Sequence, residues 1–233
     1  MPIAGVDGCR RGWIVAIDRE DGSEPRVSLF ERFGDVLTST PRLQVVAVDI
    51  PIGLASSRTC VRECDVQARA SLGHPRGLSV FTAPIRQVLG VKPHPTASAL
   101  SKELCGSGLS IQAYCIAPKI KEVDDAVSPA ESERVFEVHP EVCFAQLTGG
   151  PIQTRKKSVE GRRIRREALV AEFQDRAVSL AESAFSRKDV GTDDVYDAFA
   201  CLWTARRIGL GKHGTFPLRP PIDERGLLMR IVY

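Results

Sequence analysis

Runs of apolar residues mark out the strands that we expect in this chain. Two short runs, Ile3–Asp7 and Trp13–Asp18, are joined by a turn rich in Gly and Arg and predict a β-hairpin. Arg26–Glu31 predicts a third strand. The continuous apolar run Gln44–Leu54 is typical of a strand that is buried on both faces of a helix-covered sheet. The pattern therefore indicates an α/β fold.

The rest of the chain reads mainly as helix. Residues 58–130 predict a helical insertion, in which Arg62–Leu72 and Ser110–Val127 are helices and Gly73–Pro95 is a long irregular loop. Arg134–Glu141 returns to strand character, and Gly226–Tyr233 predicts a terminal edge strand. Further helices are expected at Phe33–Thr38, Glu141–Leu147, Gly161–Phe173, Ala177–Phe185 and Asp193–Leu210.

Size and composition fit a globular protein. A chain of 233 residues with 43% hydrophobic and 26% charged residues suits one domain, here residues 1–233 with the insertion inside it. No apolar run approaches the roughly 20 residues of a membrane helix, and the start of the chain has no signal-peptide layout. We therefore expect a cytoplasmic protein with no membrane partner.

The expected location also governs how the seven cysteines are interpreted. Cys60 and Cys64 form the one close pair, and nothing nearby completes a zinc site. In a cytosolic chain we expect all seven to be reduced and mostly to be small core residues. Within the insertion, Asp65 and Arg69 lie four residues apart and predict a plain surface ion pair.

Aspartates end two of the predicted strands. Asp7 closes the first run and Asp49 lies near the end of the buried one. Ligands of open α/β sheets gather outside the carboxyl ends of the strands, so the two carboxylates converge if these strands are parallel neighbours. The alternative is that each is an ordinary turn or capping aspartate, and the residues alone leave both possibilities open.

The last long helix carries two more carboxylates. Asp194 and Asp197 share a helix face, which continues through Cys201 and Thr204 where an exposed face would carry Lys or Glu. Capping and the helix dipole explain Asp193 well, Asp194 in part and Asp197 hardly at all. Two carboxylates at about 4 Å repel by roughly 4 kcal/mol at an effective dielectric constant of about 20. Convergence therefore calls for raised pKa values or a divalent cation, and hard oxygen ligands favour Mg²⁺ or Mn²⁺.

Two further groups of residues are candidates for the same site. Glu137 and His139 share a face of the strand at 134–141, beside Glu141, although a lone strand histidine is also commonly structural. Arg155–Arg166 packs seven cations around a single acid. Such a block is either a solvated face or a surface that contacts phosphates. The net charge of +3 is too small to indicate nucleic-acid binding by itself.

Taken together, this pattern of strand and helix aspartates resembles that of the ribonuclease H-like superfamily. The Asp194–Ala200 helix is similar to the end of RuvC-type Holliday-junction resolvases. More closely, the chain resembles a family of predicted RNase H-like nucleases, number 429 among the domains of unknown function. The matching segments are Val6–Trp13, Val48–Leu54, Pro118–Asp124, Glu137–Glu141 and the helix of Asp194 and Asp197.

The resemblance implies a mixed five-stranded sheet with helices on both faces. Its first three strands are antiparallel, and the fourth and fifth run parallel to the first. Asp7 belongs to the first strand, Asp49 to the fourth, and Glu137 and His139 to the fifth. The second carboxylate of RuvC-type enzymes is usually Glu, so Asp49 is a departure. The insertion at about 58–130 has no counterpart in minimal ribonuclease H folds and is expected to shape the substrate cleft.

The leading hypothesis is a divalent-metal-dependent nuclease. Asp7 is expected to bridge two Mg²⁺ or Mn²⁺ ions, with Asp49 on one side and Asp194 and Asp197 on the other. Glu137, His139 or Glu141 is expected to move protons or orient ligands. The residues expected to contact the phosphates of DNA or RNA are Arg10, Lys119, Lys157 and Arg162.

Two alternatives come from other classes of protein. One is a non-catalytic nucleic-acid-binding or scaffold protein that keeps the ribonuclease H-like fold. The other is an actin-like phosphotransferase, because Asp7-Gly8 before a hairpin also resembles a phosphate-binding turn. That fold needs two such domains and further Gly-rich loops, for which this chain lacks room. The sequence does not determine the oligomeric state, and a homodimer is one of the states it allows.

Overall fold

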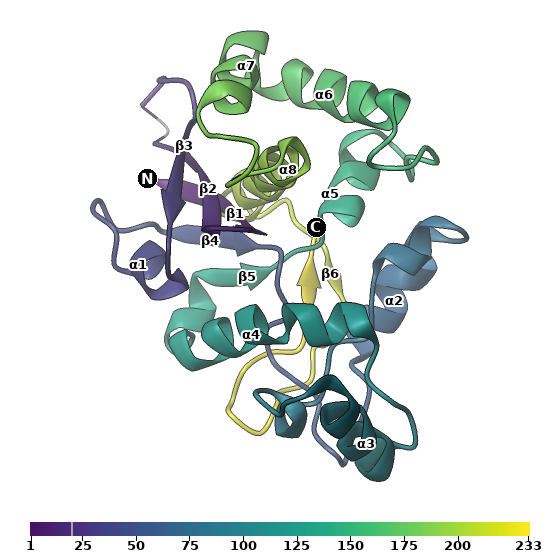
Figure 1. Ribbon diagram of the computed structural model, residues 1–233. Coiled ribbons are helices and arrows are strands. Elements are labelled where there is room, and N and C mark those ends of the chain that lie inside the picture. The colour runs from purple at the N-terminus through teal and green to yellow at the C-terminus, as the bar shows by residue number, and fades with distance from the viewer. Residues whose placement is uncertain (20) are drawn as a thin grey trace.

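A computed structural model describes residues 1–19 and 21–233. Its centre is a five-stranded sheet with the spatial order β3-β2-β1-β4-β5 (Figure 1). β1–β2 and β2–β3 pair antiparallel, whereas β1–β4 and β4–β5 pair parallel, so the expected α/β class with a mixed sheet is confirmed. The strands are β1 (Ile3–Cys9), β2 (Gly12–Asp18), β3 (Arg26–Phe30), β4 (Val45–Val48) and β5 (Val135–Glu137).

Helices flank this sheet, close to where the hydrophobic pattern predicts them. The insertion also contains a helix at 94–105 that the Gly- and Pro-rich sequence before it did not indicate. The helices are α1 (Phe33–Leu37), α2 (Glu63–Leu72), α3 (His94–Cys105), α4 (Ile111–Ala126), α5 (Pro140–Leu147), α6 (Val159–Phe173), α7 (Asp175–Ser183) and α8 (Thr192–Gly209). In the described part of the chain, no helix is long and apolar enough to cross a lipid bilayer.

Shorter elements complete the chain. Three 3₁₀ helices are η1 (Arg76–Ser79), η2 (Arg86–Val88) and η3 (Glu131–Glu133). The expected terminal strand is β7 (Ile231–Val232), which pairs with β6 (Thr215–Phe216) in a second small sheet. An isolated bridge between Val138 and Val232 places the end of the chain beside β5.

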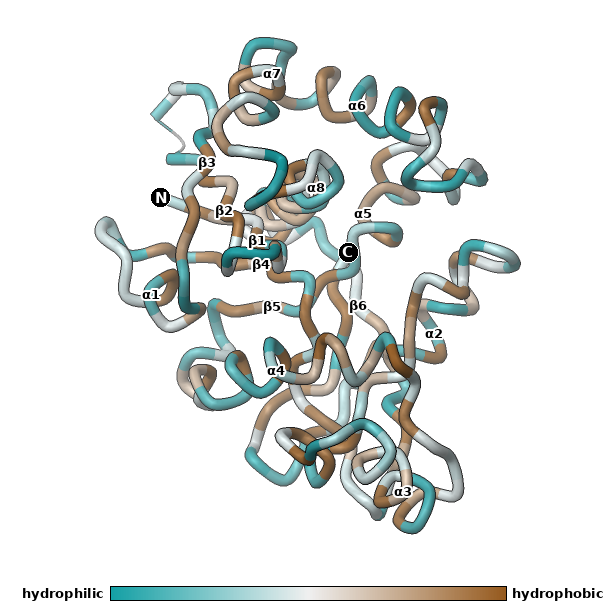
Figure 2. Tube along the Cα trace, in the orientation of Figure 1, coloured by the Kyte–Doolittle hydropathy of each residue, from teal (hydrophilic) through white to brown (hydrophobic). Residues whose placement is uncertain are grey.

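The two faces of the main sheet belong to different hydrophobic clusters. Ile3, Ile14 and Ala47 face α8, whereas Val6, Val15 and Val48 face α1 and α4. Figure 2 shows hydrophobic residues along these strands. The sheet and α8 approach very closely at Gly5, where a Cβ would lie 2.0 Å from the backbone nitrogen of Leu202 and 2.2 Å from the carbonyl oxygen of Ala198. The backbone of α8 therefore rests directly on β1.

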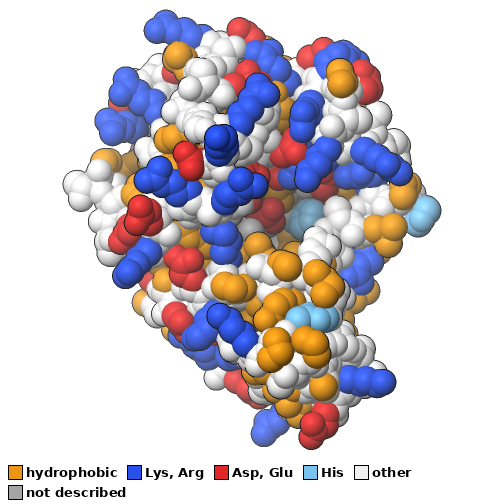
Figure 3. Space-filling view, in the orientation of Figure 1, with side chains coloured by type: hydrophobic (Ala, Val, Ile, Leu, Met, Phe, Trp, Pro, Cys, Tyr) orange, Lys and Arg blue, Asp and Glu red, His pale blue; other side chains and the backbone are white. Residues whose placement is uncertain are grey.

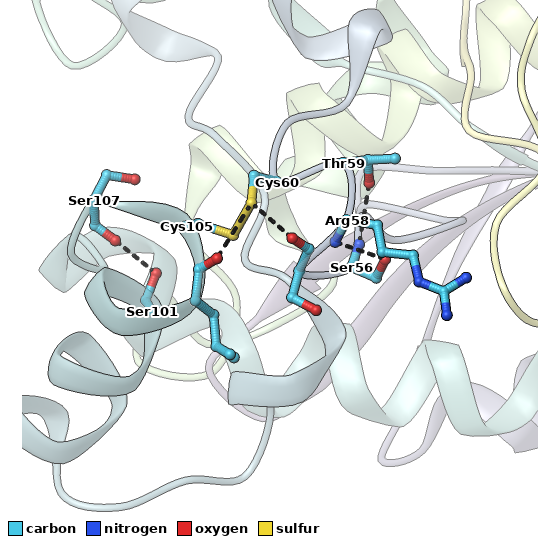
Figure 4. The surroundings of a disulfide bond; sticks show 9 residues. Ser56, Arg58, Thr59, Cys60, Ser101, Cys105 and Ser107 are labelled. Carbon is cyan, nitrogen blue, oxygen red and sulfur yellow. Dashed lines mark hydrogen bonds between the residues drawn. A yellow bond between two sulfur atoms is a disulfide. The ribbon is translucent and has the colours of Figure 1, made fainter.

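A disulfide crosses the insertion. Cys60, in the loop before α2, is bonded to Cys105 at the end of α3, and their Cα atoms are 5.5 Å apart (Figure 4). The expectation that all seven cysteines are reduced is therefore wrong. Forty-five positions separate the partners, so no local spacing indicated the pair. The other five cysteines are free and, apart from Cys115, buried as expected.

The expected surface ion pair between Asp65 and Arg69 is also wrong. Asp65 is 1% exposed and pairs with Arg62 instead, while Arg69 donates hydrogen bonds to the carbonyl oxygen of Val80. The reason is that the face of α2 that carries Asp65 is buried in the protein. The backbone N–H of Ala83 reaches the Asp65 carboxylate, and Arg62 is buried with it.

Candidate metal centre

Three aspartates meet at the carboxyl end of the sheet. Asp7 follows Gly5 by two positions and Asp49 follows Ala47 by two, so both side chains lie on the sheet face that α8 covers. Parallel pairing of β1 and β4 places these two positions side by side. Asp197 comes from the second turn of α8. One carboxylate oxygen from each residue lies within 4.8 Å of the other two.

Burial and mutual repulsion raise the pKa values of this carboxylate cluster (Asp7, Asp49 and Asp197). Asp7 is 7% exposed and Asp197 is 2% exposed. Burial, then the charges of Asp197 and Asp49, raise the pKa of Asp7 well above its usual range. The same two causes, burial and Asp197, raise the pKa of Asp49 to about 8. Burial also raises the pKa of Asp197 to about 6. Each charged pair at this separation costs roughly 3–4 kcal/mol at an effective dielectric constant of about 20.

Lys156 supplies a positive charge to the cluster. Its ammonium donates a hydrogen bond to Oδ2 of Asp197. Although burial lowers the pKa of Lys156, the charges of Asp197 and Asp7 raise it above its usual value. The other oxygen of Asp197, Oδ1, is buried and has no hydrogen-bond partner among the described residues. A buried carboxylate oxygen without a partner is costly, and a cation in the cluster would satisfy it.

The donor set fits a hard divalent cation. Three carboxylates without a nearby free thiolate favour Mg²⁺ or Mn²⁺ over zinc. Cys9, Cys143 and Cys201 lie on the same face of the sheet, but burial raises the pKa of each thiol, so all three stay protonated. The residues that could hold the ion are therefore Asp7, Asp49 and Asp197.

Asp194, the fourth predicted ligand, lies outside this cluster. Its Oδ2 accepts the backbone N–H of Gly191 at 2.9 Å and so caps the start of α8. Burial raises its pKa, against the effect of this hydrogen bond. A carboxylate at the third position of a helix can turn back to the free N–H groups, whereas Asp197, one turn later, has no such partner.

Glu137 belongs to the other face of the sheet. Its carboxylate accepts hydrogen bonds from the buried Arg62 guanidinium, at 2.7 Å to each oxygen, and from the backbone N–H of Ile52. Burial raises its pKa to about 7 despite Arg62. The same guanidinium binds the carbonyl oxygens of Ile52 and Gly53. Glu137 therefore holds the turn that follows Asp49. It supports the position of Asp49 from the opposite face of the sheet and does not itself join the cluster.

His139 and Glu141 lie on the cleft side of the cluster. Both line the cleft into which Asp7, Asp49 and Asp197 open. The Nε2 atom of His139 lies 3.4 Å from the carbonyl oxygen of Ser79, and Nδ1 is buried without a hydrogen-bond partner in the described part of the chain. Burial lowers the pKa of His139. Glu141 is held by Arg165 at 2.6 Å, and also by Arg76 from the insertion.

The cleft has a volume of about 830 Å³ and two walls of different chemistry. One, the cationic wall, consists of Arg155, Lys156 and Lys157 from the loop before α6. The other comes from the insertion and includes residues of η1 and α4. Figure 3 shows Lys and Arg side chains on one side of a hollow, acidic side chains within it, and hydrophobic side chains on the other side.

Of the four residues predicted to bind phosphate, one lines the cleft and three make contacts with other parts of the protein. Lys157 lines the cleft. Arg10 instead donates to the carbonyl oxygen of Lys188, and Lys119 donates to that of Gly12 at 2.6 Å while lying over the Trp13 ring. Arg162 pairs with Asp193. These last three are not among the residues that line the cleft.

The sequence did not single out Lys156 or Arg76. Lys156 was one of seven cations in the Arg155–Arg166 block. The surroundings of the other members show that the block alone does not distinguish a buried cation from a surface one. Arg163 pairs with Glu160 on the surface, whereas Arg165 is buried against Glu141. Which cation reaches the cluster depends on the path of the loop before α6, and no local pattern reports that path.

The fold and the site define an α/β protein with a buried acidic cluster at the carboxyl edge of a mixed sheet. Comparison with protein families confirms the resemblance to domain of unknown function 429. The chain belongs to the family described as "Protein of unknown function (DUF429)", whose model matches residues 5–222. No curated protein and no solved structure matches the chain.

Proposed function

We propose that this protein is a divalent-metal-dependent phosphodiester hydrolase that acts on nucleic acid. The observation that carries the proposal is the cluster of Asp7, Asp49 and Asp197, with its unpartnered oxygen, at the base of a cleft with a cationic wall. The strand order and the Asp-x-x-Asp helix support a place in the ribonuclease H-like superfamily. Carboxylates bind the metal, and the lysines and arginine of the opposite wall suit a polyanion.

Asp7, Asp49 and Asp197 would hold the metal, which would supply Lewis-acid activation of the attacking water and of the phosphate. Three carboxylates and the Lys156 ammonium leave a net charge of minus two when the carboxylates are ionised. One divalent ion balances that charge. A second ion would require Lys156 to leave Asp197, so the proposal is one firmly bound ion and a weaker second one.

The other residues of the cleft have separate roles in this proposal. Lys156 and Lys157 bind the phosphate on either side of the bond that is cleaved, as point charges on flexible stems. His139 accepts a proton at Nδ1, because burial lowers its pKa and keeps the ring neutral near pH 7. Arg62 and Glu137 hold the turn after Asp49 and so keep that carboxylate in position.

The test is cleavage of labelled single strands, duplexes, DNA–RNA hybrids and four-way junctions in Mn²⁺. We expect wild-type protein to cleave at least one of them and Asp7→Asn to lose activity by at least a hundredfold. Asp125→Asn, which removes an exposed carboxylate that pairs with Lys121, serves as the matched control. Equal cleavage by wild type and Asp7→Asn, or no cleavage of any substrate by wild type, would overturn the proposal.

A nucleic-acid-binding protein without turnover is the second candidate. The contact between Lys156 and Asp197 favours it, because an ammonium already neutralises part of the cluster. Calorimetric titration with Mn²⁺ separates the two functions. Saturable binding that Asp7→Asn abolishes supports the hydrolase, and absence of binding supports the second candidate.

A further inference from the structure

The insertion contributes a group of apolar side chains to the cleft, beside the polar residues Arg76, Ser79 and Gln112. Its members are Leu78 from η1, Phe81 from the loop that follows, and Cys115 and Ile116 from α4, here called the apolar wall. Cys115 and Ile116 share a helix face with Gln112, which also lines the cleft. The apolar wall and the cationic wall line one cleft together with the carboxylate cluster.

Leu78 is a strongly exposed member of the apolar wall, and the structure holds it there. Its side chain is 72% exposed. The turn beneath it is seated on α2, because a Cβ on the buried Gly77 would lie 2.5 Å from the carbonyl oxygen of Arg69. Arg69 also donates to the carbonyl oxygen of Val80, on the other side of Leu78. A large apolar side chain fixed in an exposed position gains free energy when a ligand covers it.

We propose that the cleft takes a nucleic-acid strand whose bases are unpaired next to the cleaved phosphate. This inference rests on the proposed function and names its substrate class. The phosphates follow Arg155, Lys156 and Lys157, and the bases lie against Leu78 and the rest of the apolar wall. Single-stranded nucleic acid is bound in this way, by cations along the backbone and apolar or aromatic groups on the base faces.

Duplex nucleic acid fits these walls poorly. Its base faces are stacked on one another, so a duplex offers charged backbone to both walls and leaves the apolar wall uncovered. The volume of about 830 Å³ also lies within the range of sites that enclose small ligands, which suits a short stretch of single strand. The acidic cluster is recessed between the walls, so a strand has to enter the cleft to reach it.

The test measures binding by fluorescence anisotropy, with Asp7→Asn protein so that no substrate is consumed. The probes are a labelled 12-nucleotide single strand, the matching blunt duplex, and a single strand of equal charge with abasic central positions. We expect the single strand to bind at least tenfold more tightly than the duplex and about tenfold more tightly than the abasic strand. Equal affinity for all three probes would overturn the inference, because binding would then depend on phosphate charge alone.

A second variant tests the apolar wall itself. Leu78→Ser should weaken binding of the single strand about fivefold to tenfold and leave binding of the abasic strand unchanged. Leu218→Ser is the matched control, because Leu218 is 85% exposed and does not line the cleft. Equal affinities of Leu78→Ser and Leu218→Ser for the single strand would refute the role of the wall. Cleavage by wild-type protein in Mn²⁺ is measured separately, so failure of the hydrolase proposal leaves the binding pattern interpretable.

Discussion

Replacing Asp49 with Asn is expected to stabilise the protein in the absence of metal. The cause is the crowding of Asp49 with Asp7 and Asp197 at a buried edge of the sheet. Burial and Asp197 raise the pKa of Asp49 from 3.8 to about 8, so native Asp49 holds a proton at neutral pH that the unfolded chain releases. The unfolded state gains free energy from that ionisation. Asn removes the gain and keeps the shape of the side chain.

The size of the effect follows from the same pKa values. At about 1.36 kcal/mol per pH unit, a fully buried isolated group would contribute about 4 kcal/mol at pH 7. The carboxylate of Asp49 is partly exposed, so solvent screening reduces the effect and we expect on the order of 2 kcal/mol. For a chain of this length, that raises the melting temperature by roughly 4–8 °C.

The stability of the metal-free protein should also depend on pH. Because the native pKa lies above the unfolded pKa, the stability of metal-free wild type falls as pH rises from about 4 to about 8. Asp197, with its pKa raised to about 6, acts in the same direction. Asp49→Asn should show a smaller decline across that range. Bound Mn²⁺ should restore wild-type stability near pH 8 and have little effect on the variant.

The assay is thermal unfolding followed by circular dichroism, at pH 5, 7 and 8, in EDTA and in Mn²⁺. Asp125→Asn is the control, since its ion pair with Lys121 is exposed and its loss should change stability by less than about 0.5 kcal/mol. If Asp49→Asn unfolds at a lower temperature than wild type in EDTA at pH 7, the carboxylates do not repel one another and the reasoning fails.

Three further predictions concern the contacts that build the site. Gly5→Ala should destabilise the protein by on the order of 3 kcal/mol, because its Cβ would overlap the backbone of α8, whereas Gly34→Ala, with open space around it, should have little effect in urea unfolding. Lys156→Gln should bind Mn²⁺ about tenfold more tightly by calorimetry, since the ion no longer competes with an ammonium; unchanged affinity would contradict this. Denatured, non-reduced protein should show five reactive thiols rather than seven, and Cys60→Ser should lose about 2–4 kcal/mol of stability.

Much of the sheet follows from hydrophobic patterning. The runs that end near Asp7 and Asp49 were recognisable as strands, and the observed pairing of β1 with β4 brings those residues together as expected. The bounds of the last helix were also close to those observed. Glu137 was expected beside the carboxylates. It lies on the opposite face, because its partner Val48 directly precedes Asp49 and neighbouring residues of a strand point to opposite faces of the sheet.

Two predictions failed because segments that are far apart in sequence meet in the fold, as where Glu137 of β5 holds Arg62 beside Asp65. Spacing suggested that Asp65 pairs with Arg69, but the buried guanidinium of Arg62 takes its place. The cysteines were expected to be reduced, yet Cys60 meets Cys105 across the insertion. For Asp65, burial beside Arg62 outweighs a helix-spacing pattern whose own stabilisation is a few tenths of a kcal/mol. For the cysteines, the expectation came from the assumed cytosolic location, which does not indicate which residues meet in the fold.

By itself, the sequence determined which segments become strands and helices, and hence that Asp7 and Asp49 lie at the carboxyl ends of strands. It did so because apolar periodicity and turn residues act locally. Tertiary structure alone decided which of the candidates meet: Asp197 joins the two strand aspartates as expected, Asp194 stays at the helix start as its cap, and Lys156 rather than its basic neighbours supplies the charge. The physical reason is that electrostatic contacts depend on the distance between side chains in space, which a local sequence pattern does not encode. Here that distance is set by the packing of α8 on β1, which the absence of a side chain at Gly5 permits.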